Sequence, residues 1–557
     1  MRIVSFNLTH DSSVCSYVDG EIEFYCKEER LSGKKRDMVP FLSLETYLKK
    51  DFGKIDHFLY LTPENNDSSA YYLCKRYVEK YFDIELENFS YLNHHDCHAS
   101  MAFFNSGFDK ALIFVIDRNG SLFFYNEEEV GRESESVYVG SYPPQISPLY
   151  KSFWINDENK KNLIKGVVES YYNSSNLEIN IDNPFSIVKV YESATTLIGQ
   201  HALENGKTMG LSSYGEDLDY PSLFLNGSPI RNYFSTVSTN FSVPDSSCFY
   251  GCEDKITDSV TEENYQFYAN KSKHVQKETQ KESLRLIEKY VKKTGIKNVC
   301  LVGGYGLNVV SNAYYIKNLP EVNFYFEPLS DDSGITIGAC MLKYMQESKD
   351  SSIKRPKDNF FHFYEREKEI IGKNSTISDV IDLLESQKII AIFEGNPEAG
   401  PRSLGHRSLL FDPRNPNGKE IVNTLKKREW YRPFAGVILQ DSFDTYFETL
   451  NIEKSEYMTI NFEVKPGVKE YVPSIVHVDN TCRIQTISNT KEFLFKLLKE
   501  FYNRTGCPML LNTSFNLAGK PLVHTKKDAI EFFESSKNNP LFGGIYFVDD
   551  NTMLTNI

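Results

Sequence analysis

The chain has 557 residues, a length that one hydrophobic core rarely serves, so two or more domains are expected. Hydrophobic residues make up 40% of it and charged residues 25%, which excludes a disordered protein. The net charge of −14 argues against an extensive nucleic-acid-binding surface, although a local basic pocket can exist in an acidic protein. No apolar run approaches the roughly 18 residues of a membrane span, and the N-terminus turns polar too early for a signal peptide. We therefore expect a cytoplasmic protein without membrane contact.

The first thirty residues read as three short strands, because runs of β-branched and aromatic residues are separated by a polar turn and an Asp-Gly turn. Three later segments, KALIFVID, NVCLVGGYG and VNFYFEP, read as short buried strands, and Thr279 to Thr294 has helical periodicity. Strands and helices alternate, which predicts an α/β protein, and no internal repeat is visible.

A charged, irregular stretch between Met341 and Lys373, centred on SKDSSIKRPKDN, is typical of an exposed connection between domains. We therefore expect one domain over residues 1–355 and another over residues 374–557. The second begins with a predicted helix, Ile377 to Ser386, followed by the predicted strand KIIAIFEG.

The first candidate site is the segment NHHDCHAS, in which His94 and His98 are four residues apart. On a helix this spacing places both imidazoles on one face, where they can bind one metal ion. The alternative is a structural or surface pair of histidines. Because Asp96 stands where no zinc-protease glutamate belongs, a metalloprotease is not predicted.

A third metal ligand is expected to be Asp332, which lies in a predicted strand-to-helix turn, PLSDDSG. The alternative is an ordinary helix N-cap, although Asp331 or Ser330 could cap while Asp332 binds the ion. Two neutral histidines and one carboxylate with open positions suit iron(II) or another first-row divalent ion.

Two glycine-rich segments, GKTMGLSSYG and GGYGLN, could let backbone amides approach a nucleotide closely. The second follows a predicted strand and precedes a predicted helix. The alternative is a pair of tight turns, since neither segment is a dinucleotide-binding fingerprint. The residues expected to contact an adenylate are Lys207, Gly210, Gly303, Gly304 and Asn308.

The C-terminal part contains a basic cluster in GPRSLGHRSLL, KKREWYRP and HVDNTCRIQ, where cations lie among glycine, proline and aromatic residues. Such arginines are suited to bidentate binding of phosphates. The hydroxyl and amide groups of LLNTSFN could orient a phosphate or a ribose. The alternatives are basic surface loops and a strand that simply ends in a turn. The candidate residues are Arg402, Lys426, Arg432, Arg483, Ser514 and Asn516.

Taken together and in this order, these segments resemble the NodU/CmcH family of O-carbamoyltransferases. The similarity extends over nearly the whole chain. The motifs that carry it are THDSS, EERLSGKKRD, NHHDCHAS, GKTMGLSSYG, GGYGLN, DDSG, GPRSLGHRSLL, KKREWYRPFAG, HVDNTCRIQ and LLNTSFN.

The resemblance implies an N-terminal duplicated α/β domain of the actin/Hsp70-like ATPase (ASKHA) type, similar to tRNA threonylcarbamoyl transferase, and a C-terminal YrdC-like α/β domain. It implies that the YrdC-like domain forms carbamoyl adenylate from ATP and carbamoyl phosphate. The first domain would then transfer the carbamoyl group with the help of Fe(II) held by His94, His98 and Asp332. The C-terminal residues named above would bind carbamoyl phosphate and the phosphates of ATP, with Mg²⁺ on the triphosphate.

His10, beside Asp11 in the first turn, is the candidate base that accepts the proton of the acceptor hydroxyl. The alternative is a histidine that only caps the turn. One departure from the family pattern is the segment Asp117 to Gly120, where the family has glycine directly after the aspartate, so no contacts are carried over to this segment. The stretch Val130 to Asp182 matches no family pattern and is expected to shape the acceptor pocket.

The acceptor is expected to be a hydroxyl-bearing small molecule, a sugar or a hydroxymethylated pyrimidine, with DNA as an acceptor left open and a homodimer possible. One alternative is threonylcarbamoyl or hydrogenase-maturation chemistry. The maturation proteins, however, place the YrdC-like domain first and contain zinc-finger cysteines. A second alternative is a nucleotide-dependent scaffold of the actin/Hsp70 type, against which the arginine-rich C-terminal half argues.

Overall fold

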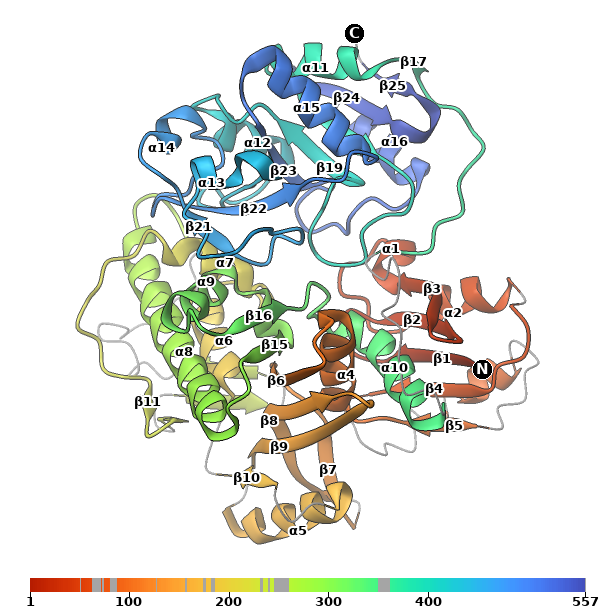
Figure 1. Ribbon diagram of the computed structural model, residues 1–557, viewed down its shortest axis with the longest axis vertical. Helices are drawn as coiled ribbons and strands as arrows, with labels where there is room; N and C mark the ends of the chain where they lie inside the picture. The colour runs from red at the N-terminus through yellow and green to blue at the C-terminus, as the bar shows by residue number, and fades with distance from the viewer. Residues whose placement is uncertain are drawn as a thin grey trace. The chain divides into compact units, whose positions relative to one another are not determined.

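The computed structural model describes residues 1–50, 52–62, 72, 75–80, 88–126, 128–155, 158–173, 177–181, 186–230, 234–238, 241–244, 260–348 and 361–555. The chain divides into two compact units (Figure 1). The first contains Met1–Glu28 and Arg36–Asn359, and the second contains Glu29–Lys35 and Phe360–Ile557. Apart from Ser348, the segment SKDSSIKRPKDN lies outside the described residues. The grouping of Glu29–Lys35 with the second unit was not predicted.

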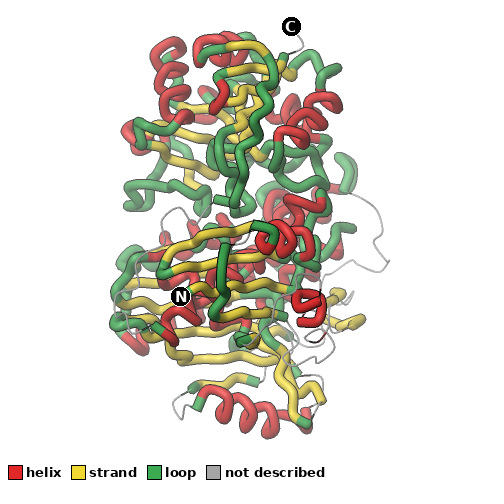
Figure 2. Tube along the Cα trace, turned by 90° about the vertical axis from the view of Figure 1, so that its right-hand side faces the viewer, coloured by secondary structure: helices red, strands yellow, loops and turns green. Residues whose placement is uncertain are grey.

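A five-stranded sheet forms the first half of unit 1, in the order β3-β2-β1-β4-β5. Strands β1, β2 and β3 form the predicted antiparallel meander, and β4 and β5 continue the sheet in parallel. Asp19 and Gly20 join β2 to β3 with φ of 48° and 94°, as the predicted Asp-Gly turn requires. Figure 2 shows strands of this sheet side by side near the N-terminus. The strands are β1 (Arg2–Asn7), β2 (Ser13–Val18), β3 (Glu21–Lys27), β4 (His57–Leu61) and β5 (Phe89–Tyr91).

A second sheet of unit 1 has the order β10-β9-β8-β6-β15-β16, with β7 paired to β8. Strands β6, β15 and β16 are the three predicted strands. The predicted burial holds for β6 and β15, whereas in β16 only Phe326 is buried. The strands are β6 (Lys110–Ile116), β7 (Leu122–Tyr125), β8 (Glu128–Ser141), β9 (Gln145–Trp154), β10 (Glu178–Asn180), β15 (Asn298–Val302) and β16 (Asn323–Phe326).

The two sheets of unit 1 repeat one arrangement. In each, an antiparallel meander of three strands is extended by two parallel strands beside its first strand, as β3-β2-β1-β4-β5 and as β9-β8-β6-β15-β16. The repeat is structural, since none is visible in the sequence. The predicted α/β class is confirmed.

Helices of unit 1 include α4, which packs against α10. A Cβ atom added to Gly338 in α10 would lie 1.9 Å from the carbonyl oxygen of Cys97 in α4, so this close approach requires glycine. The predicted helix at Thr279 to Thr294 is the second half of α8. The helices are α2 (Phe41–Leu48), α4 (His94–Ser106), α5 (Lys161–Tyr172), α6 (Ile187–Leu197), α7 (Asn205–Ser212), α8 (Tyr265–Thr294), α9 (Val309–Asn318) and α10 (Ile335–Glu347).

Short elements complete unit 1, and α1 (Glu28–Ser32) lies where the chain passes between the two units. The short helices are η1 (Glu158–Lys160), η4 (Gly304–Leu307) and η5 (Asp332–Gly334), and the short strands are β11 (Phe224–Leu225), β12 (Ser228–Pro229), β13 (Phe234–Ser238) and β14 (Phe241–Pro244).

Unit 2 is built on a mixed nine-stranded sheet in the order β17-β25-β24-β18-β19-β23-β20-β22-β21. Its central strands β18, β19, β20 and β24 are buried along their whole length. The strands are β17 (Lys373–Asn374), β18 (Ile389–Phe393), β19 (Arg407–Phe411), β20 (Ala435–Leu439), β21 (Asn461–Glu463), β22 (Thr481–Ile487), β23 (Met509–Ser514), β24 (Phe542–Phe547) and β25 (Thr552–Leu554).

Helices α11 and α15 of unit 2 pack against each other and against central strands of this sheet. The predicted helix and strand at the start of this domain are α11 and β18. No helix of the described part of the chain is both long and apolar enough to span a membrane. The helices are α11 (Ile377–Glu385), α12 (Gly418–Lys426), α13 (Phe443–Tyr446), α14 (Val468–Tyr471), α15 (Phe493–Thr505) and α16 (Lys526–Ser536), with short helices η6 (Gln440–Ser442) and η7 (Val548–Asp550).

Candidate functional site

Helix α4 carries the predicted pair of histidines at its N-terminus. Asn93 caps the helix by accepting a hydrogen bond from the amide of Asp96, so the helix begins at His94. His94 and His98 then lie one turn apart on the same face, both buried. Their ring centroids are 4.8 Å apart. The predicted geometry of the pair is confirmed.

Two carboxylates face these imidazoles. His94 Nε2 lies 3.3 Å from Asp117 Oδ2 and 3.6 Å from Asp332 Oδ1. His98 Nε2 lies 4.0 Å and 3.9 Å from the same two oxygens. One ligand atom from each of the four residues lies within 4.8 Å of the others, which makes the group a candidate metal site. Asp331 caps the following short helix, so Asp332 is left to face the site, as the sequence suggested.

The protonation state of His98 suits a metal ligand. Burial and the neighbouring charge of His94 hold the pKa of His98 well below its usual range, so its imidazole is neutral. Neither ring nitrogen of His98 has a hydrogen-bond partner among the described residues. A neutral imidazole beside two carboxylates leaves a buried lone pair unused, and a divalent ion bound by these residues would use it. The donor set of two histidines and two aspartates therefore fits a first-row metal.

Asp117 was not predicted as a ligand. It follows β6 directly, and its Oδ1 accepts a 2.8 Å hydrogen bond from the amide of Gly304. Gly303 has φ of 88°, and a Cβ atom there would lie 2.6 Å from the carbonyl oxygen of Ile116. The glycine turn after β15 therefore packs against the end of β6 and orients Asp117. A nucleotide contact by Gly303 and Gly304 remains a prediction.

A chain of charged groups connects the metal ligands with the first turn. His10 Nε2 lies 3.6 Å from Asp332 Oδ2, and His10 Nδ1 lies 3.1 Å from Asp11 Oδ2. Lys27 Nζ lies 3.3 Å from Asp11 Oδ1 and 3.3 Å from Asp331 Oδ2. His10 and Asp11 are thus beside the candidate metal site, where a base would be needed.

The charge of Asp332 decides the protonation of His10. Burial lowers the pKa of His10, but Asp332 and then Asp11 outweigh burial and raise this pKa to about 9. At pH 7 His10 therefore holds a proton as long as Asp332 carries its negative charge and no cation offsets that charge. Acceptance of a proton by His10 requires that the negative charge of Asp332 be offset.

The other residues expected to bind the adenylate lie in α7 and at the start of α9. Lys207 Nζ contacts Gln200 Oε1 at 2.7 Å and Glu204 Oε2 at 2.9 Å, and Gly210 is buried in the same helix. Asn308 caps α9 and donates a 3.0 Å hydrogen bond to Gln276. These contacts support the local fold, and a nucleotide contact by these residues remains a prediction.

In unit 2, three predicted residues meet at the end of β23. Lys426, the last residue of α12, is buried and donates to the carbonyl oxygens of Ser514 and Asn516, the latter at 2.8 Å. It also donates to Asn516 Oδ1 at 2.9 Å, and Ser514 Oγ donates to the same oxygen at 2.7 Å. The sequence-predicted lysine, serine and asparagine therefore form one polar cluster.

Arginines gather around this cluster. Burial holds the pKa of Arg428 well below its usual range, and the charges of Arg432 and Arg402 lower it further. Burial and the charges of Arg428 and Arg432 lower the pKa of Arg483 to about 10. The Nε atoms of Arg428 and Arg483 are buried without a hydrogen-bond partner among the described residues. Such crowding of cations around unused donors suits a bound polyanion.

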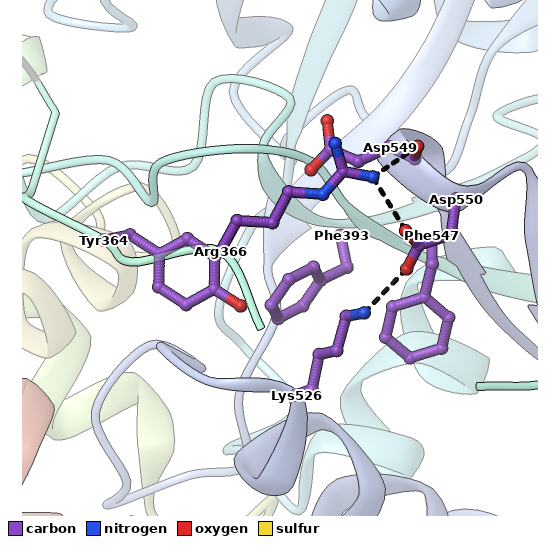
Figure 3. A pocket seen from close by; sticks show the side chains of 7 residues that line it. All are labelled: Tyr364, Arg366, Phe393, Lys526, Phe547, Asp549 and Asp550. Carbon is purple, nitrogen blue, oxygen red and sulfur yellow. Dashed lines mark hydrogen bonds and ion pairs between the residues drawn. The ribbon is translucent and has the colours of Figure 1, made fainter. Parts of the chain in front are cut away.

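A pocket elsewhere in unit 2 is lined by side chains that satisfy one another (Figure 3). Asp550 accepts from Arg366 Nη2 at 2.8 Å and from Lys526 Nζ at 2.6 Å. Asp549 Oδ2 accepts from the amide of Gly395 at 2.9 Å. The remaining walls are rings, Tyr364, Phe393 and Phe547. These contacts give the pocket a structural role.

Comparison with known proteins gives matches over most of the chain. Family models described as Carbamoyltransferase N-terminus and Carbamoyltransferase C-terminus match residues 59–341 and 381–549. The uncharacterized protein MJ1051 of Methanocaldococcus jannaschii is 31% identical over 413 residues, which cover 68% of this chain and 75% of that protein. The nodulation protein NolNO of Sinorhizobium fredii is 24% identical over 597 residues, which cover 98% of this chain and 79% of that protein.

Among solved structures, T. kodakarensis HypF matches with a TM-score of 0.38 and 10% sequence identity. The match covers 62% of this chain and 47% of the HypF chain.

Proposed function

The chain belongs to the carbamoyltransferase family, and we propose from this that it is an ATP- and carbamoyl phosphate-dependent O-carbamoyltransferase. In this proposal residues 374–557 cleave carbamoyl phosphate to carbamate and inorganic phosphate, and then join the carbamate to the AMP part of ATP with release of pyrophosphate. Residues 1–355 transfer the carbamoyl group from this adenylate to a hydroxyl of an acceptor and release AMP. Carbamate itself is a poor electrophile, so joining it to AMP as a leaving group makes the transfer feasible.

The arrangement of strands supports the proposed domain types. The repeated strand order of unit 1 is what a duplicated actin/Hsp70-like domain would have. For unit 2 we propose a YrdC-like domain, on the basis of the C-terminal family match and the polyanion-binding character of its basic cluster. The two alternatives considered from the sequence were threonylcarbamoyl or hydrogenase-maturation chemistry and a nucleotide-dependent scaffold. Neither gains specific support.

We assign the binding of carbamoyl phosphate and of the ATP phosphates to the basic cluster of unit 2. Guanidinium groups in a buried site offset the negative charge that accumulates when two anionic substrates meet. Lys426 keeps the β23 end in place, so that Ser514 and Asn516 can orient an oxygen of the substrate. Mg²⁺ would accompany the triphosphate. The proposed residues are Arg402, Lys426, Arg428, Arg432, Arg483, Ser514 and Asn516.

In unit 1, His94, His98, Asp117 and Asp332 would hold a first-row divalent ion, for which we propose Fe(II). When bound, such an ion supplies Lewis acidity to an oxygen of the substrate. The residues themselves exclude water from the site, because all four are buried.

His10 is the proposed base for the acceptor hydroxyl. Its Nδ1 faces Asp11, which Lys27 in turn contacts, so the ring is oriented with Nε2 toward the metal ligands. With the charge of Asp332 offset, the pKa of His10 falls toward its ordinary value and Nε2 can accept a proton. Asp11 then stabilises the imidazolium.

The observation that carries the proposal is the buried group of two imidazoles and two carboxylates within the N-terminal family match. For the acceptor we propose a small molecule, a sugar or a hydroxymethylated pyrimidine. The test is to incubate the protein with ATP, carbamoyl phosphate and a panel of hydroxyl compounds, including hydroxymethylated nucleotides and DNA, and to search by mass spectrometry for the gain of one carbamoyl unit. The absence of any carbamoylated product with a protein that forms the adenylate would restrict the proposal to adenylate formation.

A further inference from the structure

A fully buried lysine lies on β9, beside the long strand β8. Lys151 Nζ donates a 2.7 Å hydrogen bond to Glu133 Oε1 and a 2.5 Å hydrogen bond to the hydroxyl of Tyr138. It also lies 3.6 Å from Asp96 Oδ1. The side chains of both Lys151 and Glu133 are 0% exposed. Burial of two such charges is costly unless they are paired, and no local pattern of the chain predicts a pair here.

The second oxygen of Glu133 joins two separate parts of the chain. Glu133 Oε2 accepts a 3.2 Å hydrogen bond from Asn93 Nδ2 and a 3.1 Å hydrogen bond from the amide of Ser121. The backbone of Glu133 also pairs with the same loop, since the amide of Gly120 donates to its carbonyl oxygen and its own amide donates to that of Ser121.

These two parts carry three of the four candidate metal ligands. Asn93 is the N-cap of α4, the helix of His94 and His98. Ser121 ends the loop that Asp117 begins, and Ser121 Oγ accepts a 3.0 Å hydrogen bond from the amide of His94. One carboxylate oxygen therefore connects the start of the histidine helix with the loop of the aspartate.

The same buried group also holds the first turn of α4. Asp96 Oδ1 accepts a 2.6 Å hydrogen bond from Tyr138 and a 3.2 Å hydrogen bond from Tyr172. Asp96 lies between the two histidines in sequence, so these contacts resist rotation of the helix about its axis. His95 is turned away from the ligands and contacts Ser136 at 2.7 Å.

We infer that Glu133 is a positioning residue for the metal site, and that Lys151 holds its carboxylate in place. The inference rests on the proposed function only in that the four ligands must bind an ion. Outer-shell partners of this kind commonly change metal affinity by about 10- to 100-fold when they are lost. This gives a defined role to part of the stretch Val130 to Asp182, whose expected role in the acceptor pocket remains a prediction.

The test is titration of the metal-free protein with Mn²⁺, followed by calorimetry, for the variants Glu133→Gln and Glu135→Gln. Glu135 is the matched control. It is a buried glutamate of the same strand, and its carboxylate accepts a hydrogen bond from the backbone amide of Ile187, which belongs neither to α4 nor to the loop of Asp117. We expect Glu133→Gln to weaken Mn²⁺ binding about tenfold or more. Glu135→Gln should bind Mn²⁺ within about twofold of the unaltered protein, since no ligand depends on it.

A second variant, Asn93→Ser, tests the positioning role of Glu133 if Glu133→Gln does not fold. Serine caps a helix about as well as asparagine, so α4 should remain intact while the link to Glu133 is lost. Weaker Mn²⁺ binding by Asn93→Ser with an unchanged melting temperature would support the inference. Unchanged affinity in Asn93→Ser, or an equal loss in Glu135→Gln, would overturn it. If the unaltered protein binds no Mn²⁺, the proposed metal site itself fails together with the inference.

Discussion

Asp117 Oδ2 lies 3.3 Å from Nε2 of His94, although the two residues come from different elements, the end of β6 and the start of α4. The contact brings a carboxylate to a helix whose two histidines alone would not make a metal site. The pKa values of the two histidines shift in opposite directions. Asp332 and then Asp117 raise the pKa of His94 in spite of burial, whereas burial and the charge of His94 lower the pKa of His98.

Asp117 should therefore be a metal ligand. The variant Asp117→Asn keeps the shape of the side chain but removes its charge, and we expect it to weaken Mn²⁺ binding by about 100-fold or more, beyond the loss of an outer-shell partner. Calorimetric titration of the metal-free protein measures this. Asp109→Asn, at the exposed opposite end of β6, is the matched control and should bind Mn²⁺ normally. Equal affinity of the two variants would remove Asp117 from the site.

Arg483 should be required for formation of the adenylate. Its guanidinium is buried among other cations with Nε unpaired, and it would offset charge on the anionic substrates. We expect Arg483→Met to slow the release of pyrophosphate from ATP and carbamoyl phosphate by about 100-fold or more. Arg504→Met removes an arginine of the same unit that pairs with Asp382 and Glu385 on α11, and it should retain the rate. A normal rate in Arg483→Met would place the anions elsewhere.

Substitution of His10 should impair carbamoyl transfer without affecting formation of the adenylate. We expect His10→Asn to reduce carbamoyl transfer by about 100-fold or more, because the general base is lost, while pyrophosphate release is unchanged. The two rates are measured on the same preparation, so a folding defect would show as loss of both. Transfer at the normal rate would leave His10 as a residue that only supports the first turn.

Acid should destabilise unit 2 through His524. Burial, with the charges of Arg407 and Arg30, lowers the pKa of His524 to about 3 in the folded protein. The unfolded chain, with a pKa of about 6.5, binds a proton first, so stability falls as the pH drops from about 6.5 toward 3. Between pH 7 and pH 5 the unaltered protein should lose about 2 kcal/mol more than His524→Asn in urea unfolding. Parallel losses in the two proteins would show that His524 titrates normally.

Local patterns in the sequence predicted much of this arrangement. The Asp-Gly turn and the runs of β-branched and aromatic residues predicted the β1–β3 meander. The spacing of His94 and His98 predicted that both residues lie on one face of a helix. Lys426, Ser514 and Asn516 were singled out in two separate segments of the sequence, and the structure brings these three residues together at the end of β23.

Features that depend on the pairing of strands far apart in the sequence could not be predicted. An aspartate after β6 resembles an ordinary turn until β15 pairs with β6 and places Gly304 against it. The hydrogen bond from Asn93 to Glu133 likewise depends on the pairing of β8 with β6. It also depends on the burial of Glu133, which no local sequence pattern indicates. The signal that could have identified Asp117 is its position directly after a buried strand.

The most direct test of the central claim is exchange of labelled pyrophosphate into ATP by the unaltered protein. Formation of carbamoyl adenylate is reversible, so we predict exchange when carbamoyl phosphate is present and none when it is omitted. A folded protein that shows no exchange with carbamoyl phosphate, or the same exchange without it, would contradict the proposal that this chain activates carbamoyl phosphate as an adenylate.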